Sequence, residues 1–242
     1  MRPLLYGELT SWYHLIDPVE DHEDEAAALR EAIERTATLA PETLLELGAG
    51  AGNNAFYLRQ HYRCTLTDRS AEMLALSRAR NPGCEHVQGD MRSLRLGRLF
   101  DAVLIHDAIV YMTTAADLLA AARTAFVHLR PGGAAVFAPD VTRERFREKS
   151  EAMARDAGGR SLRGIEWTWD PDPGDSTYDV DFALLLREGS DMRAVHDRHR
   201  CGLFDAATWR RVLAEAGFEV GTFVRPIDDE GSFDEIFVCR RR

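Results

Sequence analysis

Between residues 43 and 138, short apolar runs alternate with longer runs that have the spacing of amphipathic helices. The predicted strands are 43–47, 64–67, 85–88, 100–105 and 134–138, and the predicted helices are 54–61, 71–80 and 115–129. The run Ala102 to Ile105 is continuously apolar, which fits a strand buried on both faces. This alternation predicts an α/β fold with a doubly wound, mostly parallel sheet.

The pattern changes after residue 139. Runs around 165–169, 178–186 and 193–201 alternate polar and apolar residues, and turns rich in Asp, Pro and Gly separate them. They predict a three-stranded antiparallel insertion over residues 163–201, whereas the charged stretch 144–155 is predicted to be helical. A helix over 208–216 and a closing antiparallel pair, 218–225 and 233–239, complete the chain.

Composition excludes several classes of protein. The net charge is −10, from 40 acidic and 30 basic residues, which is unfavourable for binding a nucleic acid. No apolar run reaches the roughly 18 residues of a membrane span. The four cysteines lack the paired spacing of zinc or redox motifs, so we expect no metal, reduced thiols and a cytoplasmic enzyme. We expect one domain over 1–242, with a helical cap over 1–39.

The segment from Glu46 to Gly52 is the most informative motif. An apolar strand runs into glycines at 48, 50 and 52, and glycine is needed where backbone turns sharply or lies flat against a ligand. The dinucleotide fingerprint needs its third glycine at position 53, which is Asn53, and no Lys-Ser or Lys-Thr follows as in a phosphate-binding loop. A tight structural turn is the alternative explanation.

Two aspartates follow the next two predicted strands. Asp68 ends the second strand, where an acidic side chain can accept hydrogen bonds from both ribose hydroxyls. Asp90 follows the third strand, in the sequence Gly89-Asp90-Met91, and is placed to accept a bond from an adenine amino group. Helix N-capping is the alternative for each. Together with the glycines, they favour a nucleoside-containing cofactor.

These motifs resemble those of the class I S-adenosylmethionine-dependent methyltransferases, over about residues 40–139 and 203–239. That resemblance implies a seven-stranded sheet whose last strand is antiparallel. The run Gly89 to Arg98 and His199, with Leu203-Phe204 ahead of Trp209, resemble bacterial N-methyltransferases of nucleotide-linked amino sugars, of the desosamine and mycaminose type. The chain differs from them after the Trp12-Tyr13 segment and around Trp167 and Trp169, so the acceptor stays open.

The resemblance implies S-adenosylmethionine as cofactor and assigns residues to it. Glu46 opens the motif, Gly48, Ala49 and Gly50 would lie under the methionine and ribose, Asp68 would hold the ribose, Arg69, Met73, Asp90 and Met91 would surround the adenine, His106 would lie near the sulfonium, and Tyr13 would close over the cofactor.

Methyl transfer needs a nucleophile held in line with the sulfonium carbon, and a nitrogen or oxygen acceptor must also lose a proton. Tyr111 and His199 are the candidate catalytic residues. His196 should lie on the opposite face of its strand from His199. Trp167, Trp169 and Tyr178 could form an aromatic wall over the acceptor, or simply pack the insertion.

The sequence therefore predicts a methyltransferase for a small-molecule N or O acceptor, working as a monomer or homodimer, with the insertion covering the acceptor site. Two alternatives are a catalytically silent module that binds the cofactor or a partner, and a nicotinamide oxidoreductase, against which the position of the third glycine argues.

Overall fold

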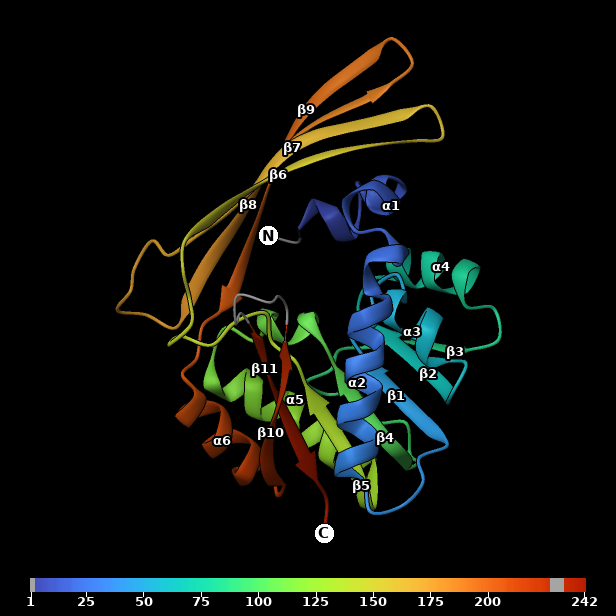
Figure 1. Ribbon diagram of the computed structural model, residues 1–242, viewed down its shortest axis with the longest axis vertical. Helices are drawn as coiled ribbons and strands as arrows, with labels where there is room; N and C mark the ends of the chain where they lie inside the picture. Colours follow the sequence, from blue (N-terminus) through green and yellow to red (C-terminus); the bar gives the residue numbers. More distant parts are fainter. Residues whose placement is uncertain (1–2, 227–232) are drawn as a thin grey trace.

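A seven-stranded sheet forms the centre of the computed structural model, which describes residues 3–226 and 233–242 (Figure 1). Its strands are β1 (Thr43–Leu47), β2 (Arg63–Asp68), β3 (Glu85–Gln88), β4 (Phe100–Ile105), β5 (Leu129–Phe137), β10 (Glu219–Pro226) and β11 (Phe233–Arg240). They lie in the order β10-β11-β5-β4-β1-β2-β3. Strands β1 to β5 are parallel, whereas β11 is antiparallel to both β5 and β10. The predicted doubly wound sheet with an antiparallel closing pair is confirmed.

Helices cover both faces of this sheet. On one face lie α2 (Glu23–Thr36) and α3 (Asn53–Leu58), and on the other lie α5 (Ala115–His128) and α6 (Ala206–Glu215). Helix α4 (Ala71–Arg80) packs beside β2 and β3. The caps Ser70, Thr114 and Asp205 each accept the backbone N–H three residues later, which fixes where α4, α5 and α6 begin.

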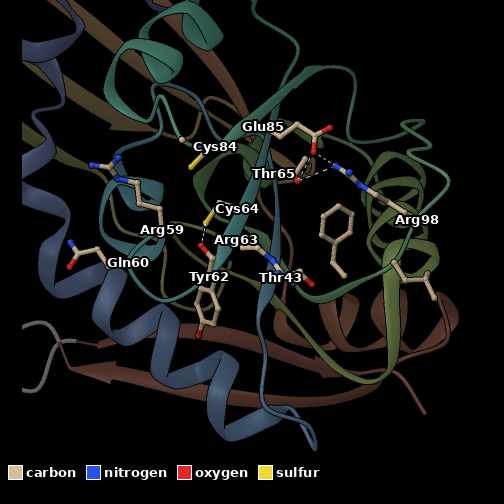
Figure 2. A pocket seen from close by; sticks show the side chains of 13 residues that line it. Thr43, Arg59, Gln60, Tyr62, Arg63, Cys64, Thr65, Cys84, Glu85 and Arg98 are labelled. Atoms are coloured by element: carbon tan, nitrogen blue, oxygen red, sulfur yellow. Dashed lines mark hydrogen bonds and ion pairs between the residues drawn. The ribbon is translucent and has the colours of Figure 1, made fainter.

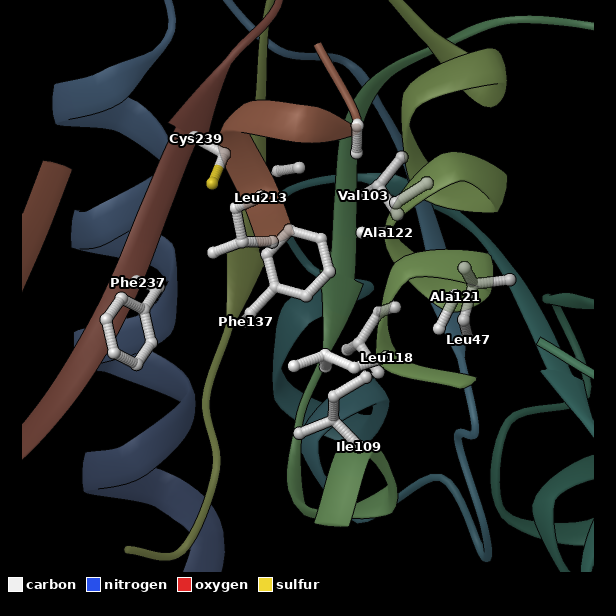
Figure 3. Close-up of a cluster of buried hydrophobic side chains, with 14 of the residues drawn as sticks. Leu47, Val103, Ile109, Leu118, Ala121, Ala122, Phe137, Leu213, Phe237 and Cys239 are labelled. Atoms are coloured by element: carbon white, nitrogen blue, oxygen red, sulfur yellow. The ribbon is translucent and has the colours of Figure 1, made fainter. Parts of the chain in front are cut away.

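The larger core cluster lies between the sheet and helices α5 and α6 (Figure 3). Leu118 of α5 and Leu213 of α6 pack in one cluster with Val103 and Phe137 of the sheet, and all four side chains are fully buried. Burying one such side chain contributes about 2 kcal/mol to stability. Leu47 and Ile105, the last residues of β1 and β4, belong to the same cluster, so this packing anchors the carboxyl ends of both strands.

The amino-terminal segment is a string of short helices, η1 (Leu4–Tyr6), η2 (Thr10–Trp12), α1 (Tyr13–Ile16) and η3 (Val19–His22), that leads into α2. The first two residues of the predicted cap lie outside the described residues. Leu9, Trp12 and Leu15 are buried against Leu162 and Leu184 of a second sheet. The segment is thereby held between the two sheets (Figure 1).

The second sheet is antiparallel and has four strands, not the three that were predicted. They are β6 (Lys149–Ala157), β7 (Arg160–Trp169), β8 (Thr177–Glu188) and β9 (Asp191–Gly202), in that order. The predicted helix over 144–155 is wrong, because most of that stretch forms β6. Only Met153 of this edge strand is even partly buried, so its sequence has no alternation of polar and apolar residues. Strand β6 is held in place by its backbone hydrogen bonds to β7 and not by burial of its own side chains.

Among residues 3–226 and 233–242, no helix combines the length and the apolar character needed to cross a membrane.

Candidate active site

A cavity of about 650 Å³ opens at the carboxyl ends of β1, β2 and β4, where the order of the strands reverses. Doubly wound sheets bind ligands at this position, and the volume falls within the roughly 300–1,000 Å³ of ligand pockets. Of the predicted site residues, those that line the cavity are Tyr13, Glu46, Gly48, Ala49, Gly50, Asp68, Arg69, Met91, His106 and Tyr111.

The glycine loop forms the floor of the cavity. Gly48, Gly50 and Gly52 have φ angles of 79°, 54° and 72°, a region that side chains disfavour. A Cβ atom on Gly48 would lie 2.8 Å from Met91 Cε and still closer to the Cβ of Ala108. The three glycines are therefore needed for the fold of the loop, and they leave its backbone open to a ligand.

The Asp68 side chain holds the glycine loop in place through hydrogen bonds. Its Oδ2 atom accepts the N–H of Gly50 at 3.0 Å, and its Oδ1 atom accepts the N–H of Ser70 at 2.7 Å. The carboxylate is thus held in one orientation at the edge of the cavity, as a group that binds ribose hydroxyls must be. Met73 does not line the cavity, because it is fully buried beneath Gly50.

Glu46 carries an unused acceptor. Its side chain is only 3% exposed, and among the described residues its Oε2 atom has no hydrogen-bond partner. Burial raises the pKa of this carboxyl to about 8. A buried polar atom without a partner is costly, so a ligand that brings an N–H or O–H group to this end of the cavity fits it.

Met91 is buried and lines the cavity, whereas Asp90 does not line it. The Asp90 carboxylate holds the guanidinium of Arg92 at 2.7 and 3.0 Å, and these bonds lower its pKa. Arg69 lies 3.4 Å from the same carboxylate. The contact of Asp90 with adenine remains a prediction.

Carboxylates surround His106 at the end of β4. Its Nε2 atom lies 3.0 Å from both Glu25 and Asp107. Burial opposes a charge on this imidazole, but the two carboxylates outweigh it and raise the pKa of His106 well above its usual value. The two carboxylates thus favour the protonated form of His106, which makes this histidine a poor candidate for a general base.

A second cluster of polar side chains, around His22 and beside Tyr13, was not predicted. The Tyr13 hydroxyl donates to Asp17 at 2.7 Å, and His22 lies 2.7 Å from the same carboxylate. Burial opposes a charge on His22, but hydrogen bonds with Asp17 and Glu25 raise its pKa to about 10. No motif marks these residues, because they come together only when the amino-terminal segment folds over α3.

The two predicted catalytic residues are in direct contact. The Tyr111 hydroxyl, at the end of η4 (Asp107–Tyr111), lies 2.7 Å from Nδ1 of His199 on β9. On its other side it lies 2.7 Å from the hydroxyl of Tyr6. Nε2 of His199 lies 3.1 Å from Asp197, and both of these residues are about 95% buried. Tyr6 and Asp197, which were not predicted, complete a network that begins in the cavity.

The Asp197 carboxylate also holds the start of the chain. It accepts the N–H groups of Leu4 and Leu5 at 2.9 and 2.8 Å, so one carboxylate orients both His199 and the segment that carries Tyr6. His196 lies on the opposite face of β9, as predicted, with a side chain that is 63% exposed. Trp167 and Trp169 stack on each other but do not line the cavity.

Comparison with known proteins agrees with this geometry. The methyltransferase domain family matches residues 44–133. A dTDP-3-amino-3,6-dideoxy-alpha-D-glucopyranose N,N-dimethyltransferase of Streptomyces fradiae is 30% identical over 221 residues, covering 88% of this chain and 85% of that protein. The chain belongs to the class I S-adenosylmethionine-dependent methyltransferases. A related N,N-dimethyltransferase of Streptomyces venezuelae, acting on dTDP-3-amino-3,4,6-trideoxy-alpha-D-glucopyranose, is 29% identical and covers 83% of this chain and 85% of its own.

Solved structures share the fold of this methyltransferase. Streptomyces venezuelae DesVI superposes with a TM-score of 0.83 at 24% identity, over 96% of each chain. CalS10, an amino pentose methyltransferase of Micromonospora echinaspora solved with S-adenosylmethionine bound, has a TM-score of 0.78 at 25% identity, over 91% of each chain. The cofactor is S-adenosylmethionine, as predicted, and the unpaired acceptor on Glu46 and the open glycine loop fit it.

Proposed function

We propose that this methyltransferase transfers methyl groups to the amino group of a nucleotide-linked amino sugar. The observation that carries the proposal is the network of Tyr6, Tyr111, His199 and Asp197, which leads from the cavity to a buried carboxylate. The names of the relatives from Streptomyces, both N,N-dimethyltransferases of dTDP-amino sugars, support the same class of acceptor.

The bound cofactor supplies an electrophilic methyl group on a sulfonium, and the protein must bring the amine into line with it. Tyr13 and Asp68 both line the cavity and are proposed to hold the cofactor, while Tyr6 and Tyr111, which line the same cavity, are proposed to face the acceptor. Holding the amine and the methyl group close together and in line supplies much of the rate in such a reaction. The positive charge is already on the sulfonium and only disperses in the transition state, so little other stabilisation is needed.

The network removes the proton that each methylation leaves on nitrogen. Burial raises the pKa values of Tyr6 and Tyr111 well above those of free phenols, so both stay protonated and can only pass a proton on. Asp197 accepts from Nε2–H of His199, which leaves Nδ1 free to accept from Tyr111. A proton taken up at Nδ1 then gives an imidazolium beside a buried carboxylate. A second methylation of the same nitrogen needs this step.

The antiparallel sheet and the amino-terminal segment are proposed to cover the acceptor. His199 of β9 and Tyr6 of η1 both contact Tyr111, so the two elements meet at that end of the cavity.

We also propose that residues 1–242 form one domain, with residues 1–39 as a cap, and that the enzyme is a cytoplasmic monomer or homodimer. All four cysteines are free thiols, in agreement with a reducing compartment.

The test is a matched pair of acceptors, a dTDP-3-amino-sugar and the same sugar with a 3-hydroxyl group. With S-adenosylmethionine, we expect mass spectrometry to show one and then two added methyl groups on the amine and none on the hydroxyl analogue. Methylation of the hydroxyl analogue instead would assign an oxygen acceptor. If neither sugar reacts while calorimetry shows that the cofactor binds, the proposed acceptor class is wrong.

A further inference from the structure

A second cavity, of about 760 Å³, lies at the opposite, amino-terminal edge of strands β1 to β4, away from the methyl-transfer site (Figure 2). Two of the four cysteines line it, Cys64 at the start of β2 and Cys84 just before β3. Cys84 is partly exposed, whereas Cys64 is 6% exposed and lies behind it. Neither thiol takes part in the proposed chemistry.

The strand register brings the two thiols together. Thr65 of β2 is opposite Glu85 of β3, and their side chains are hydrogen-bonded at 3.3 Å. Cys64 and Cys84 each come one residue earlier, so they also face each other, on the other side of the sheet, because side chains alternate along a strand. Neighbouring strands lie about 4.8 Å apart. That spacing lies within the roughly 4.4–6.8 Å between Cα atoms that a disulfide spans.

The surroundings make the two thiols unequal. The neighbouring Cys64 thiol and the guanidinium of Arg59 lower the pKa of Cys84 to about 7. The neighbouring Cys84 thiol and burial raise the pKa of Cys64, whose Sγ–H donates to the carbonyl of Tyr62 at 3.5 Å. Figure 2 shows both sulfur atoms on the Arg59 side of the pocket. A partly exposed thiol of lowered pKa on a strand next to a second thiol is the arrangement found in redox-sensitive pairs.

We propose that Cys84 and Cys64 form an oxidation-sensitive pair, in which Cys84 reacts first with a peroxide and Cys64 then closes a disulfide between β2 and β3. The Cys84 sulfur attacks one peroxide oxygen, the O–O bond breaks, and the leaving hydroxide takes a proton to become water. The Cys64 sulfur then attacks the resulting sulfenic acid, and the S–O bond breaks with loss of a second water. Two thiols and one hydrogen peroxide thus give one disulfide and two waters.

The disulfide would enclose residues 65–83, which include Asp68 and Ser70 of the cavity lining and Met73, buried beneath Gly50. A bond that fits the native geometry stabilises a fold mainly by restricting the unfolded chain. Oxidation should therefore raise the melting temperature of the protein by stabilising the segment that carries Asp68. A thiol reductant should reverse this rise.

The experiment treats the native, full-length protein with hydrogen peroxide and follows its mass. We expect a loss of about 2 Da, for two hydrogens. Peptide mapping should show a cross-link between Cys64 and Cys84, and dithiothreitol should restore the mass and melting temperature. In Cys84→Ser, Cys64 should remain a free thiol. In Cys64→Ser, Cys84 should accumulate a sulfenic acid that dimedone traps.

Cys239→Ser is the matched control, because Cys239 is fully buried on the other half of the sheet, and this variant should still form the cross-link. A disulfide that involves Cys201 or Cys239, or direct oxidation of Cys84 to a sulfinic acid in the wild type, would overturn the pairing. A fall in melting temperature on oxidation would show that the native strands do not accommodate the bond.

Discussion

Replacing Asp68 by alanine should weaken cofactor binding, in addition to the loss of stability that follows from its two backbone hydrogen bonds. In the structure, the carboxylate accepts backbone N–H groups from Gly50 and Ser70, and Asp68 lines the cavity. Leaving the ribose hydroxyls without an acceptor costs about 1–3 kcal/mol. At 1.4 kcal/mol for each factor of ten, the dissociation constant should rise about 5- to 150-fold.

The assay is calorimetric titration with S-adenosylhomocysteine, paired with thermal unfolding. Asp101→Ala is the matched control, because the Asp101 carboxylate also accepts two backbone N–H groups, from Glu42 and Thr43 at 3.2 and 3.0 Å, but at the far edge of the sheet. It should lower the melting temperature and leave the affinity unchanged. The ribose assignment is refuted if Asp68→Ala keeps wild-type affinity, or if both variants lose affinity equally.

Three further predictions concern the same cavity. Gly48→Ala should lower the melting temperature much more than Gly50→Ala. Both glycines have positive φ, which destabilises any residue with a side chain by about 1–2 kcal/mol, but of the two only a Cβ on Gly48 would lie closer than 3 Å to neighbouring atoms. Equal melting temperatures of the two variants would contradict this difference in packing. Since the pKa of Glu46 is raised from 4.5 to about 8, the folded state holds an extra proton between those values and loses stability, on the order of a few kcal/mol, as the pH rises through them. Urea unfolding of Glu46→Gln at pH 5 and pH 8 should lack this decline, and an unchanged pH slope would rule out a raised pKa. His199→Ala should lower turnover of the amine about 10²-fold while the affinity for S-adenosylhomocysteine stays the same, and an equal loss of both would give His199 a structural role only.

The sequence could place the glycine loop and Asp68 at one cavity because their signals are local. The glycines at 48, 50 and 52 have positive φ, and Asp68 ends its strand where the ribose is expected. Such features depend on a few consecutive residues, so the sequence shows them. Met73 is the exception, because helix α4 turns it under the loop rather than into the cavity.

The acceptor end could be predicted only in part. Tyr111 was predicted because it follows the His106-Asp107 turn, and His199 by family position. Asp197 contacts Leu5 across 192 residues of chain, and no spacing pattern indicates such a pair. Strand β6 was missed for a similar reason. It buries neither face, so its structure comes from hydrogen bonds to β7 and not from its own side chains.

The amino-terminal segment contacts both ends of the cavity, and this links the two ligands energetically. The carbonyl of Tyr6 accepts a hydrogen bond from Ser70 beside the ribose site, while its hydroxyl contacts Tyr111 at the acceptor end. Whichever ligand orders this segment first lowers the entropic cost of binding the second, so positive cooperativity is expected, with the same factor in both directions. Titrating S-adenosylhomocysteine with and without saturating amino sugar measures that factor, and identical affinities would mean that the segment is fully ordered before either ligand arrives.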